Sequence, residues 1–391
     1  MDERMKEDLE DYDTVEVEPE SQQIQENTEA KSTEDYPNLS IKIEQAQYSI
    51  FEIKRRYDKG RICIDPDFQR NDVWNSRQKS ELIESVIMGI PLPLIYLAEN
   101  ADGKLIVVDG RQRLSTFFDF LDDKFRLKDL KILSQINGMN MSDINNSKLY
   151  SRYVTMIEDT QLVVQIIKYP TKDRVRFDIF DRVNRGGTPL NKQEMRNALY
   201  QGNATKLLKE LAESDSFQEA TGKSISAKHM KDRYIILRAL CFYLLFQEKF
   251  INKSGQKIVY RSDMEEFLGN GMQYLNMLTE KETAALKHLF DQTMKMAYRC
   301  SGKDGFRIPS KGKAKRPISM TLFETLFYYY TLFEDGKVYT NQVIRGGIES
   351  LLEDKQYLQS LQHAVDSSVN VNKRFQKVIQ KYKEIADVIK A

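Results

Sequence analysis

Residues 104–121 read KLIVVDGRQRLSTFFDFL, and this stretch decides which fold the sequence predicts. It opens with the uninterrupted apolar run LIVV, which is typical of a buried strand. Asp109-Gly110 then allows a sharp turn, because glycine adopts backbone conformations that other residues avoid. Apolar residues follow at helical spacing, at Leu114, Phe117 and Leu121. The sequence therefore predicts a buried strand that runs through a tight polar turn into a helix.

Short elements on both sides of this stretch complete a small α/β domain. Residues 94–98 and 104–108 form a predicted hairpin whose turn ends in Asp102-Gly103. Asn191-Lys-Gln-Glu194 has the spacing of a capping box at the start of a helix. Ser76 is the expected N-cap of the helix that follows it. The other predicted elements are strands over 61–65 and 161–168 and helices over 49–57, 77–88 and 171–183.

From residue 204 onward the apolar pattern is almost wholly helical. The predicted helices span residues 204–212, 232–247, 261–278, 281–297, 318–333, 340–352 and 368–389. A loop at 301–317 is rich in Gly, Pro and Lys and carries six basic residues against one Asp. We therefore predict an α+β fold with three segments: an acidic disordered segment at 1–40, an α/β domain at 41–200 and an all-helical domain at 201–391.

The charge of the chain is divided unevenly. Residues 1–36 hold 14 acidic and three basic side chains, whereas the remainder holds 44 acidic and 56 basic ones. The acidic segment has few apolar residues and cannot bury enough surface to offset its ordering entropy, so we expect it to be disordered. The basic remainder favours partners that carry phosphate, although a modest positive excess is also ordinary for a surface of this size.

Composition excludes several classes of protein. No stretch approaches 18 consecutive apolar residues, and the N-terminus is acidic where a signal peptide would be basic and then apolar. We therefore expect a soluble cytoplasmic chain with no membrane anchor. The three cysteines are too far apart for a disulfide framework or a thiolate zinc site. The three histidines share no ligand spacing, so a catalytic histidine cluster is not expected.

The turn at Asp109-Gly110 is the strongest candidate for chemistry. The helix after it presents backbone N–H groups and the positive end of its dipole, which favour an anion. Arg111 and Arg113 bracket the helix start and can each bind two phosphate oxygens, and Gln112 can orient a water molecule or a base edge. The alternative is an ordinary turn between a hairpin and a helix, with two solvated arginines.

Two further segments carry polar residues in turns. Asp65-Pro-Asp-Phe-Gln-Arg70 would place Gln69 and Arg70 at the opening of the same domain. In the alternative interpretation, Phe68 and Trp74 fill the core and Arg70 is only a charge at its rim. Asn184-Arg-Gly186-Gly187 follows a helix, and consecutive glycines can expose backbone N–H groups to a phosphate or ribose. In the plainer interpretation Gly186 is a helix C-cap and Pro189 begins the next helix.

Four motifs together resemble one family. They are DPDFQR with VW at 65–74, LIESVIMGIPLPLIYL at 82–97, VVDGRQRLST at 107–116 and IFDRVNRGGTPLNKQEMRNAL at 179–199. In this order they resemble the DUF262 family, the N-terminal domain of GmrSD-type modification-dependent restriction enzymes. That family belongs to the ParB/sulfiredoxin-like superfamily, whose hallmark here is a DGQQR motif. The resemblance covers roughly residues 47–200, and Arg233, Arg238 and the segment 371–375 extend it toward the helical part.

The resemblance implies a protein that binds and hydrolyses a nucleoside triphosphate and that senses or helps to cut DNA in bacterial antiphage defence. Asp109, Gly110, Gln112 and Arg113 match the DGQQR positions, Gln69 and Arg70 match the family's QR, and Asn184, Gly186 and Gly187 match its asparagine–glycine loop. Asp109, Gln112, Arg113 and Arg70 are thereby the candidate catalytic residues, and the others are candidate nucleotide contacts. Arg111 stands where the hallmark has Gln. This departure favours phosphate binding and puts hydrolysis in doubt.

Mg²⁺ is the cofactor expected with the triphosphate, and Asp109 and Asp65 are its candidate ligands. No GxxxxGK[ST] motif is present, so the NTPase would not be of the P-loop class. The isolated histidines predict that this chain carries no HNH nuclease, so a separate nuclease subunit is a possible partner.

Two other functions stay open. One is metal-dependent nicking of DNA by the ParB-like domain itself, and the other is a binding module that responds to nucleotide or DNA without hydrolysis. In the basic loop, Lys311, Lys313, Lys315 and Arg316 are the predicted DNA contacts, made to phosphate since only Phe306 could stack on a base. The alternative is a solvated, mobile loop.

Overall fold

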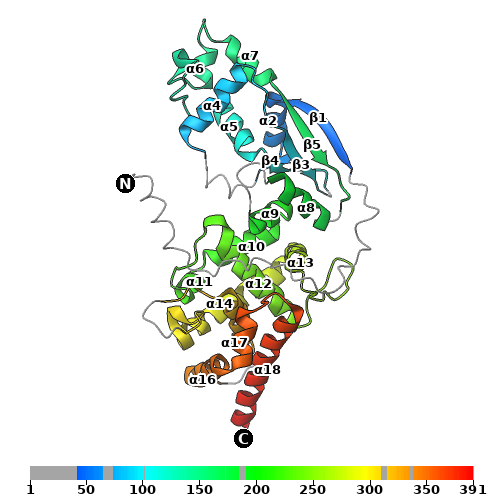
Figure 1. Ribbon diagram of the computed structural model, residues 1–391, viewed down its shortest axis with the longest axis vertical. Coiled ribbons are helices and arrows are strands. Elements are labelled where there is room, and N and C mark those ends of the chain that lie inside the picture. The colour runs from blue at the N-terminus through cyan, green and yellow to red at the C-terminus, as the bar shows by residue number, and fades with distance from the viewer. Residues whose placement is uncertain are drawn as a thin grey trace. The chain divides into compact units, whose positions relative to one another are not determined.

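The computed structural model describes residues 42–64, 74–100, 102–171, 173–184, 191–309, 315–333 and 338–390. They form two compact units that divide between Leu199 and Tyr200. The first unit holds a small mixed sheet with its helices, and the second is built of helices (Figure 1). The predicted α+β fold is confirmed. The acidic segment 1–40 lies outside the described residues.

The sheet of the first unit has five strands in the order β1-β5-β3-β4-β2. β3 and β4 form the predicted antiparallel hairpin, while β5 pairs with β3 and β2 with β4 in parallel. β1 pairs antiparallel with β5 at the edge of the sheet. The strands are β1 Ile43–Ser49, β2 Ile62–Cys63, β3 Ile95–Glu99, β4 Leu105–Asp109 and β5 Gln161–Ile167. The sequence pattern did not predict β1, because most of this edge strand is exposed and polar.

Helices cover both faces of the sheet at β4. Successive side chains of a strand point to opposite faces, and Leu105 and Val107 belong to the main core with residues of α2, α4 and α5. Ile106 and Val108 are buried on the other face, where α8 and α9 contact β4. The helices of this unit are α2 Ile50–Asp58, α4 Ser76–Ile87, α5 Arg111–Leu121, α6 Met141–Asn145, α7 Arg152–Asp159, α8 Asp173–Asn184 and α9 Lys192–Leu199.

Side chains cap the starts of α2, α4, α6 and α9, with one correction to the predicted caps. The capping box at α9 is confirmed, since the backbone N–H groups of Asn191 and Glu194 each donate to the other's side chain at 2.8 Å. The N-cap of α4 is Asn75 and not Ser76 as predicted. Asn75 caps the helix because Gln78, three residues later, completes a reciprocal capping box with it. Ser76 could not form such a box, since the residue three positions after it is Lys79, whose side chain only donates.

The helical unit is organised around two buried helices, α12 and α15, whose residues are buried on nearly every side. The helices are α10 Asn203–Ala212, α11 Asp215–Ala220, α12 Lys231–Phe246, α13 Met264–Met277, α14 Glu280–Ser301, α15 Met320–Thr331, α16 Asn341–Glu353, α17 Lys355–Gln362 and α18 Ser368–Lys390. The short helices α11 and α17 were not predicted. None of the described helices is long and apolar enough to cross a membrane.

A buried ion-pair network joins three helices of this unit. Glu324 of α15 is fully buried and accepts hydrogen bonds from Arg238 Nε of α12 at 2.7 Å and from Arg374 Nη2 of α18. Arg238 Nη2 also donates to Asp366 Oδ1 at 2.9 Å. Burial acts to lower the pKa of Arg238, but Glu324, Tyr234 and Asp366 raise it well above its ordinary value. Arg238 therefore stays charged, and the network ties α12, α15 and α18 together.

Candidate functional site

The turn between β4 and α5 has a backbone that only glycine accommodates well. Gly110 has φ +91°, in the left-handed region, and it precedes the first residue of α5. A Cβ at this position would lie 2.9 Å from Ile95 Cγ1 and 3.3 Å from Arg113 Nη2. α5 begins at Arg111, so Arg111, Gln112 and Arg113 lie on its first turn, and Asp109 is the last residue of β4.

The N-terminus of α5 presents backbone donors. Leu114 N–H bonds to Gly110 C=O at 2.9 Å, and the amides before it are those that a helix leaves without intrahelical acceptors. Gly110 has no side chain to cap them, and the first turn contains no acidic residue. Its charged residues are Arg111 and Arg113. This arrangement of amides, dipole and positive charge suits an anion such as a phosphate group.

Arg113 is engaged by acceptors of its own chain. Its guanidinium donates to Pro93 C=O, to Leu94 C=O at 2.9 Å and to Asp109 Oδ2 at 3.0 Å. Burial lowers the pKa of Arg113, and the nearby carboxylate of Asp109 opposes that shift. Arg113 thus fixes the start of β3 against the end of β4, and it positions the turn that carries the other residues.

Gln112 carries a polar atom that the fold does not satisfy. The side chain is half-buried, and its Oε1 is buried with no hydrogen-bond donor in the part of the chain that the structure describes. Most buried polar atoms in proteins are hydrogen-bonded. An acceptor left in this state on the first turn of α5 suits a ligand or a water molecule that donates a hydrogen bond.

Sequence reasoning missed a second polar group, on α9. Gln193, Arg196 and Asn197 share one arc of the helix and are at most 2% exposed. Arg196 Nη1 donates to Gln193 Oε1 at 2.9 Å. The i, i+3, i+4 spacing of three polar residues could have been read from the sequence, but their burial depends on α8 and β4, which both contact α9.

Several predicted site residues cannot be placed. Asp65, Gln69, Arg70, Gly186 and Gly187 lie outside the described residues, and Asn184 is described only as the last residue of α8. The structure therefore brings together residues 109–113, and α8 and α9 pack on the strand that leads to them.

Of the two predicted Mg²⁺ ligands, Asp109 is the one that the structure describes. Within the described ranges, no group of three or more His, Cys, Asp or Glu side chains is placed to hold an ion. Asp109 Oδ2 accepts from Arg113, and the side chain is 34% exposed, so its second oxygen can face a ligand. One carboxylate together with phosphate oxygens is a usual way for proteins to bind Mg²⁺.

The basic loop is described at 301–309 and from Lys315 onward, so Lys311 and Lys313 lie outside the described residues. Lys315 is exposed and pairs with Asp304 at 2.8 Å, which holds the pKa of that carboxyl below its usual range. Arg316 is exposed. Phe306 is buried in the core of the helical unit, so it is not available to stack on a base.

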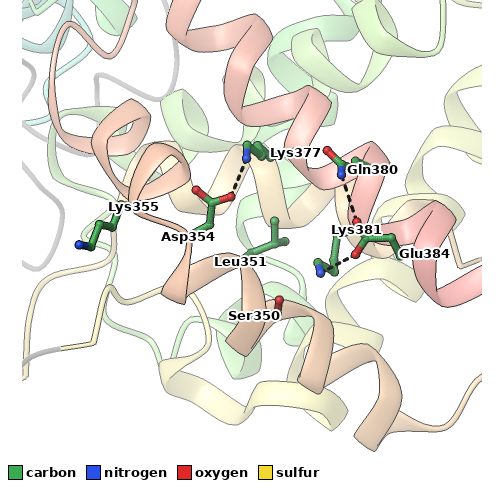
Figure 2. A pocket seen from close by; sticks show the side chains of 8 residues that line it. All are labelled: Ser350, Leu351, Asp354, Lys355, Lys377, Gln380, Lys381 and Glu384. Atoms are coloured by element: carbon green, nitrogen blue, oxygen red, sulfur yellow. Dashed lines mark hydrogen bonds and ion pairs between the residues drawn. The ribbon is translucent and has the colours of Figure 1, made fainter.

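A cavity of about 300 Å³ lies between α16, α17 and α18 of the helical unit (Figure 2). Four of its five charged lining residues form two pairs: Lys377 with Asp354 at 2.7 Å and Lys381 with Glu384 at 2.6 Å. These lysines hold the pKa values of both carboxyls below their usual range. Lys355, the fifth charged residue of the lining, leaves the cavity with one positive charge that these two pairs do not compensate.

The sequence comparisons agree with the motifs in the first unit. Residues 50–201 match the family model described as GmrSD restriction endonuclease, N-terminal domain. No curated protein and no solved structure matches the chain. The matched segment holds the β4–α5 turn and all of α9. Over residues 50–201 the chain therefore carries a domain of the GmrSD N-terminal (DUF262) family, a domain associated with restriction.

Proposed function

We propose that the first unit binds a nucleoside triphosphate at the β4–α5 turn and that the protein couples this binding to an action on DNA in restriction. The observation that carries the proposal is the uncapped N-terminus of α5, which offers backbone donors beside Arg111. The restriction family of the domain supports DNA as the macromolecular partner.

The residues of the turn would have different roles in binding the triphosphate. The amides of the first turn and Arg111 hold phosphate oxygens, because preorganised donors stabilise phosphate charge at no reorganisation cost. Arg113 keeps the turn in place through Pro93, Leu94 and Asp109. Asp109 would hold a Mg²⁺ ion on the phosphates, where the ion supplies further charge neutralisation. Gln112 accepts a hydrogen bond from a water molecule or a base edge.

The residues of the turn favour binding of the triphosphate over its hydrolysis. Phosphoryl transfer to water needs a group that orients the attacking water molecule as well as charge stabilisation. Arg111 occupies a position where the family hallmark has Gln, and a guanidinium donates hydrogen bonds but cannot accept one from water. We therefore propose that the protein binds the nucleoside triphosphate tightly and hydrolyses it slowly.

Arg111→Ala is expected to weaken nucleotide binding about 10- to 100-fold, since it removes a charge-assisted contact to phosphate. The measurement is calorimetric titration of the protein with each of the four NTPs and Mg²⁺, with phosphate release followed with and without duplex DNA. The matched control is Arg77→Ala, which removes an exposed arginine of α4 whose ion-pair partner among the described residues is Glu81. Arg111→Gln, which restores the hallmark, should bind less tightly and hydrolyse faster.

Two results would refute the site. One is a folded wild-type protein that binds none of the four nucleotides, and the other is an Arg111→Ala variant that binds as tightly as wild type. DNA-stimulated phosphate release would support the coupling to DNA. Contact with DNA through Lys311, Lys313, Lys315 and Arg316 stays a prediction.

A further inference from the structure

We infer that the helical unit carries a surface that binds the phosphate backbone of duplex DNA, formed where the end of α11 meets the segment after α14. This basic surface consists of the exposed residues Lys223, Lys303, Lys315 and Arg316. The inference rests on the proposed function for the identity of its partner, since a restriction domain makes DNA the expected polyanion. Lys315 and Arg316 are predicted DNA contacts, and the structure brings Lys223 to them from a distant part of the chain.

Direct contacts hold Lys223 beside Lys303. Lys223 lies between Gly222 and Ser224, and both neighbours touch the segment that carries Lys303. A Cβ on Gly222 would lie 3.1 Å from Lys303 Cβ, so the stem of that lysine packs against the backbone at Gly222. Ser224 Oγ accepts a hydrogen bond from Arg307 Nη2 at 2.7 Å. The end of α11 and the segment after α14 therefore adjoin on both sides of Lys223.

Arg307 also joins Lys315 and Arg316 to this surface. Its side chain is mostly buried, and its guanidinium donates to Arg316 C=O and pairs with Asp304. Lys315 Nζ pairs with the same carboxylate at 2.8 Å. Arg307 is thus a positioning residue that connects three stretches of chain, and the exposed cations lie around it.

The acidic residues of these stretches do not balance their positive charge. Residues 219–231, 301–309 and 315–317 hold seven basic side chains, and their acidic residues are Glu219 and Asp304. Asp304 is already paired, and Lys315 holds the pKa of its carboxyl below the usual range. A cluster of exposed charges of one sign raises the local concentration of oppositely charged ligands. The surface therefore attracts anions.

The residue types of this surface favour the backbone of a duplex. Lysine and arginine contacts to phosphate position DNA without reading its sequence. Proteins that bind single strands add aromatic side chains on which the bases stack, whereas Phe306, the Phe, Tyr or Trp residue of these stretches, is buried in the core. A duplex carries one phosphate charge per about 1.7 Å of its axis, so neighbouring cations can each meet one. We expect binding that does not depend on base sequence.

The test is fluorescence anisotropy with a short labelled DNA duplex, in the absence of nucleotide, between about 50 and 200 mM salt. Wild type should bind the duplex with an affinity that falls steeply as salt rises. A triple variant should bind about 10- to 100-fold more weakly at the lower salt, and the slope of log affinity against log salt should be shallower by about 2 to 3. Lys223→Gln alone should make this slope shallower by about 1. The triple variant is Lys223→Gln, Lys303→Gln and Arg316→Gln.

The matched control removes the same charge from three exposed positions of the same unit. Two of these positions follow α12, and the third lies in the first turn of α14, at the opposite end of that helix from Lys303. This control should change the affinity for the duplex less than about threefold, because exposed charges that do not contact DNA are screened by salt. The control variant is Lys253→Gln, Arg261→Gln and Lys281→Gln.

Thermal unfolding of each variant shows whether it is folded, and titration with Mg²⁺–NTP should give wild-type affinity in both triple variants. Equal weakening by the two triple variants, or no weakening by the surface variant, would overturn the inference. Tighter binding of the corresponding single strand would overturn it in favour of base contacts. Displacement of the duplex by polyglutamate at equal charge would overturn it in favour of an acidic protein. Wild type that binds nucleotide but no duplex would overturn the inference while the nucleotide site of the proposed function stands, and binding of neither would overturn both.

Discussion

Glu324→Gln should lower the stability of the helical unit by about 3–5 kcal/mol, because it leaves two buried arginines without the carboxylate between them. Glu324 is fully buried and accepts from Arg238 and from Arg374, which are 2% and 0% exposed. Asp366 would then be the remaining carboxylate on Arg238 in this network. A loss of this size is a large fraction of the 5–15 kcal/mol that usually holds a domain together.

The measurement is urea denaturation followed by circular dichroism at 222 nm, which reports the helices. Glu248→Gln is the matched control, since Glu248 pairs with Lys257 at the surface, where both side chains are at least 66% exposed. It should change stability by less than about 1 kcal/mol. Replacing Arg238, Glu324 and Arg374 together by Met, Leu and Met should recover much of the loss. A Glu324→Gln variant within 1 kcal/mol of wild type would contradict the account of the network.

Arg113→Met should destabilise the first unit by about 2–3 kcal/mol and abolish nucleotide binding along with it. Three acceptors lose their donor at once: the carbonyls of Pro93 and Leu94 and the carboxylate of Asp109. The methionine keeps the stem of the side chain, so the effect reports the guanidinium and not lost packing. The conformation of the β4–α5 turn depends on the same contacts, so the anion site should be lost even where the unit remains folded.

Trp74, the single tryptophan of the chain, packs against the core of the first unit and gives a specific probe. Its fluorescence transition in urea should move to lower concentration in Arg113→Met and stay in place in Arg77→Met. Arg111→Ala should also leave this transition unchanged while it weakens binding. Loss of binding in Arg113→Met without a shift of the Trp74 transition would show that Arg113 contacts the ligand and does not act by positioning.

The centre of the first unit could be predicted from sequence because its signals are local. The apolar run at 105–108, Asp109-Gly110 and the helical spacing after Arg113 lie within one short stretch, and the structure has β4 and α5 there. The edge strand β1 gave no such signal, because it is polar and held by pairing with β5, more than a hundred residues later. The same holds for α11 and α17, which are too short for a clear apolar period.

The chemistry of the site was harder to read for a related reason. The sequence shows that Arg113 is near the turn, but its acceptors Pro93 and Leu94 lie about twenty residues upstream, and their approach comes from the pairing of β3 with β4. Gln193 and Arg196 look like ordinary polar residues of a helix until α8 and β4 bury them. Residue type was readable from the sequence, whereas burial and partners depend on tertiary packing.

Hydrogen exchange of the backbone amides at 110–114 tests the central claim most directly. The amides of the first turn of α5 precede the intrahelical bond from Leu114 to Gly110, so they should exchange fast in the free protein. With a saturating Mg²⁺–NTP, the account predicts that exchange slows at Arg111, Gln112 and Arg113. Tight binding with unchanged exchange at these amides and protection confined to the helical unit would contradict it.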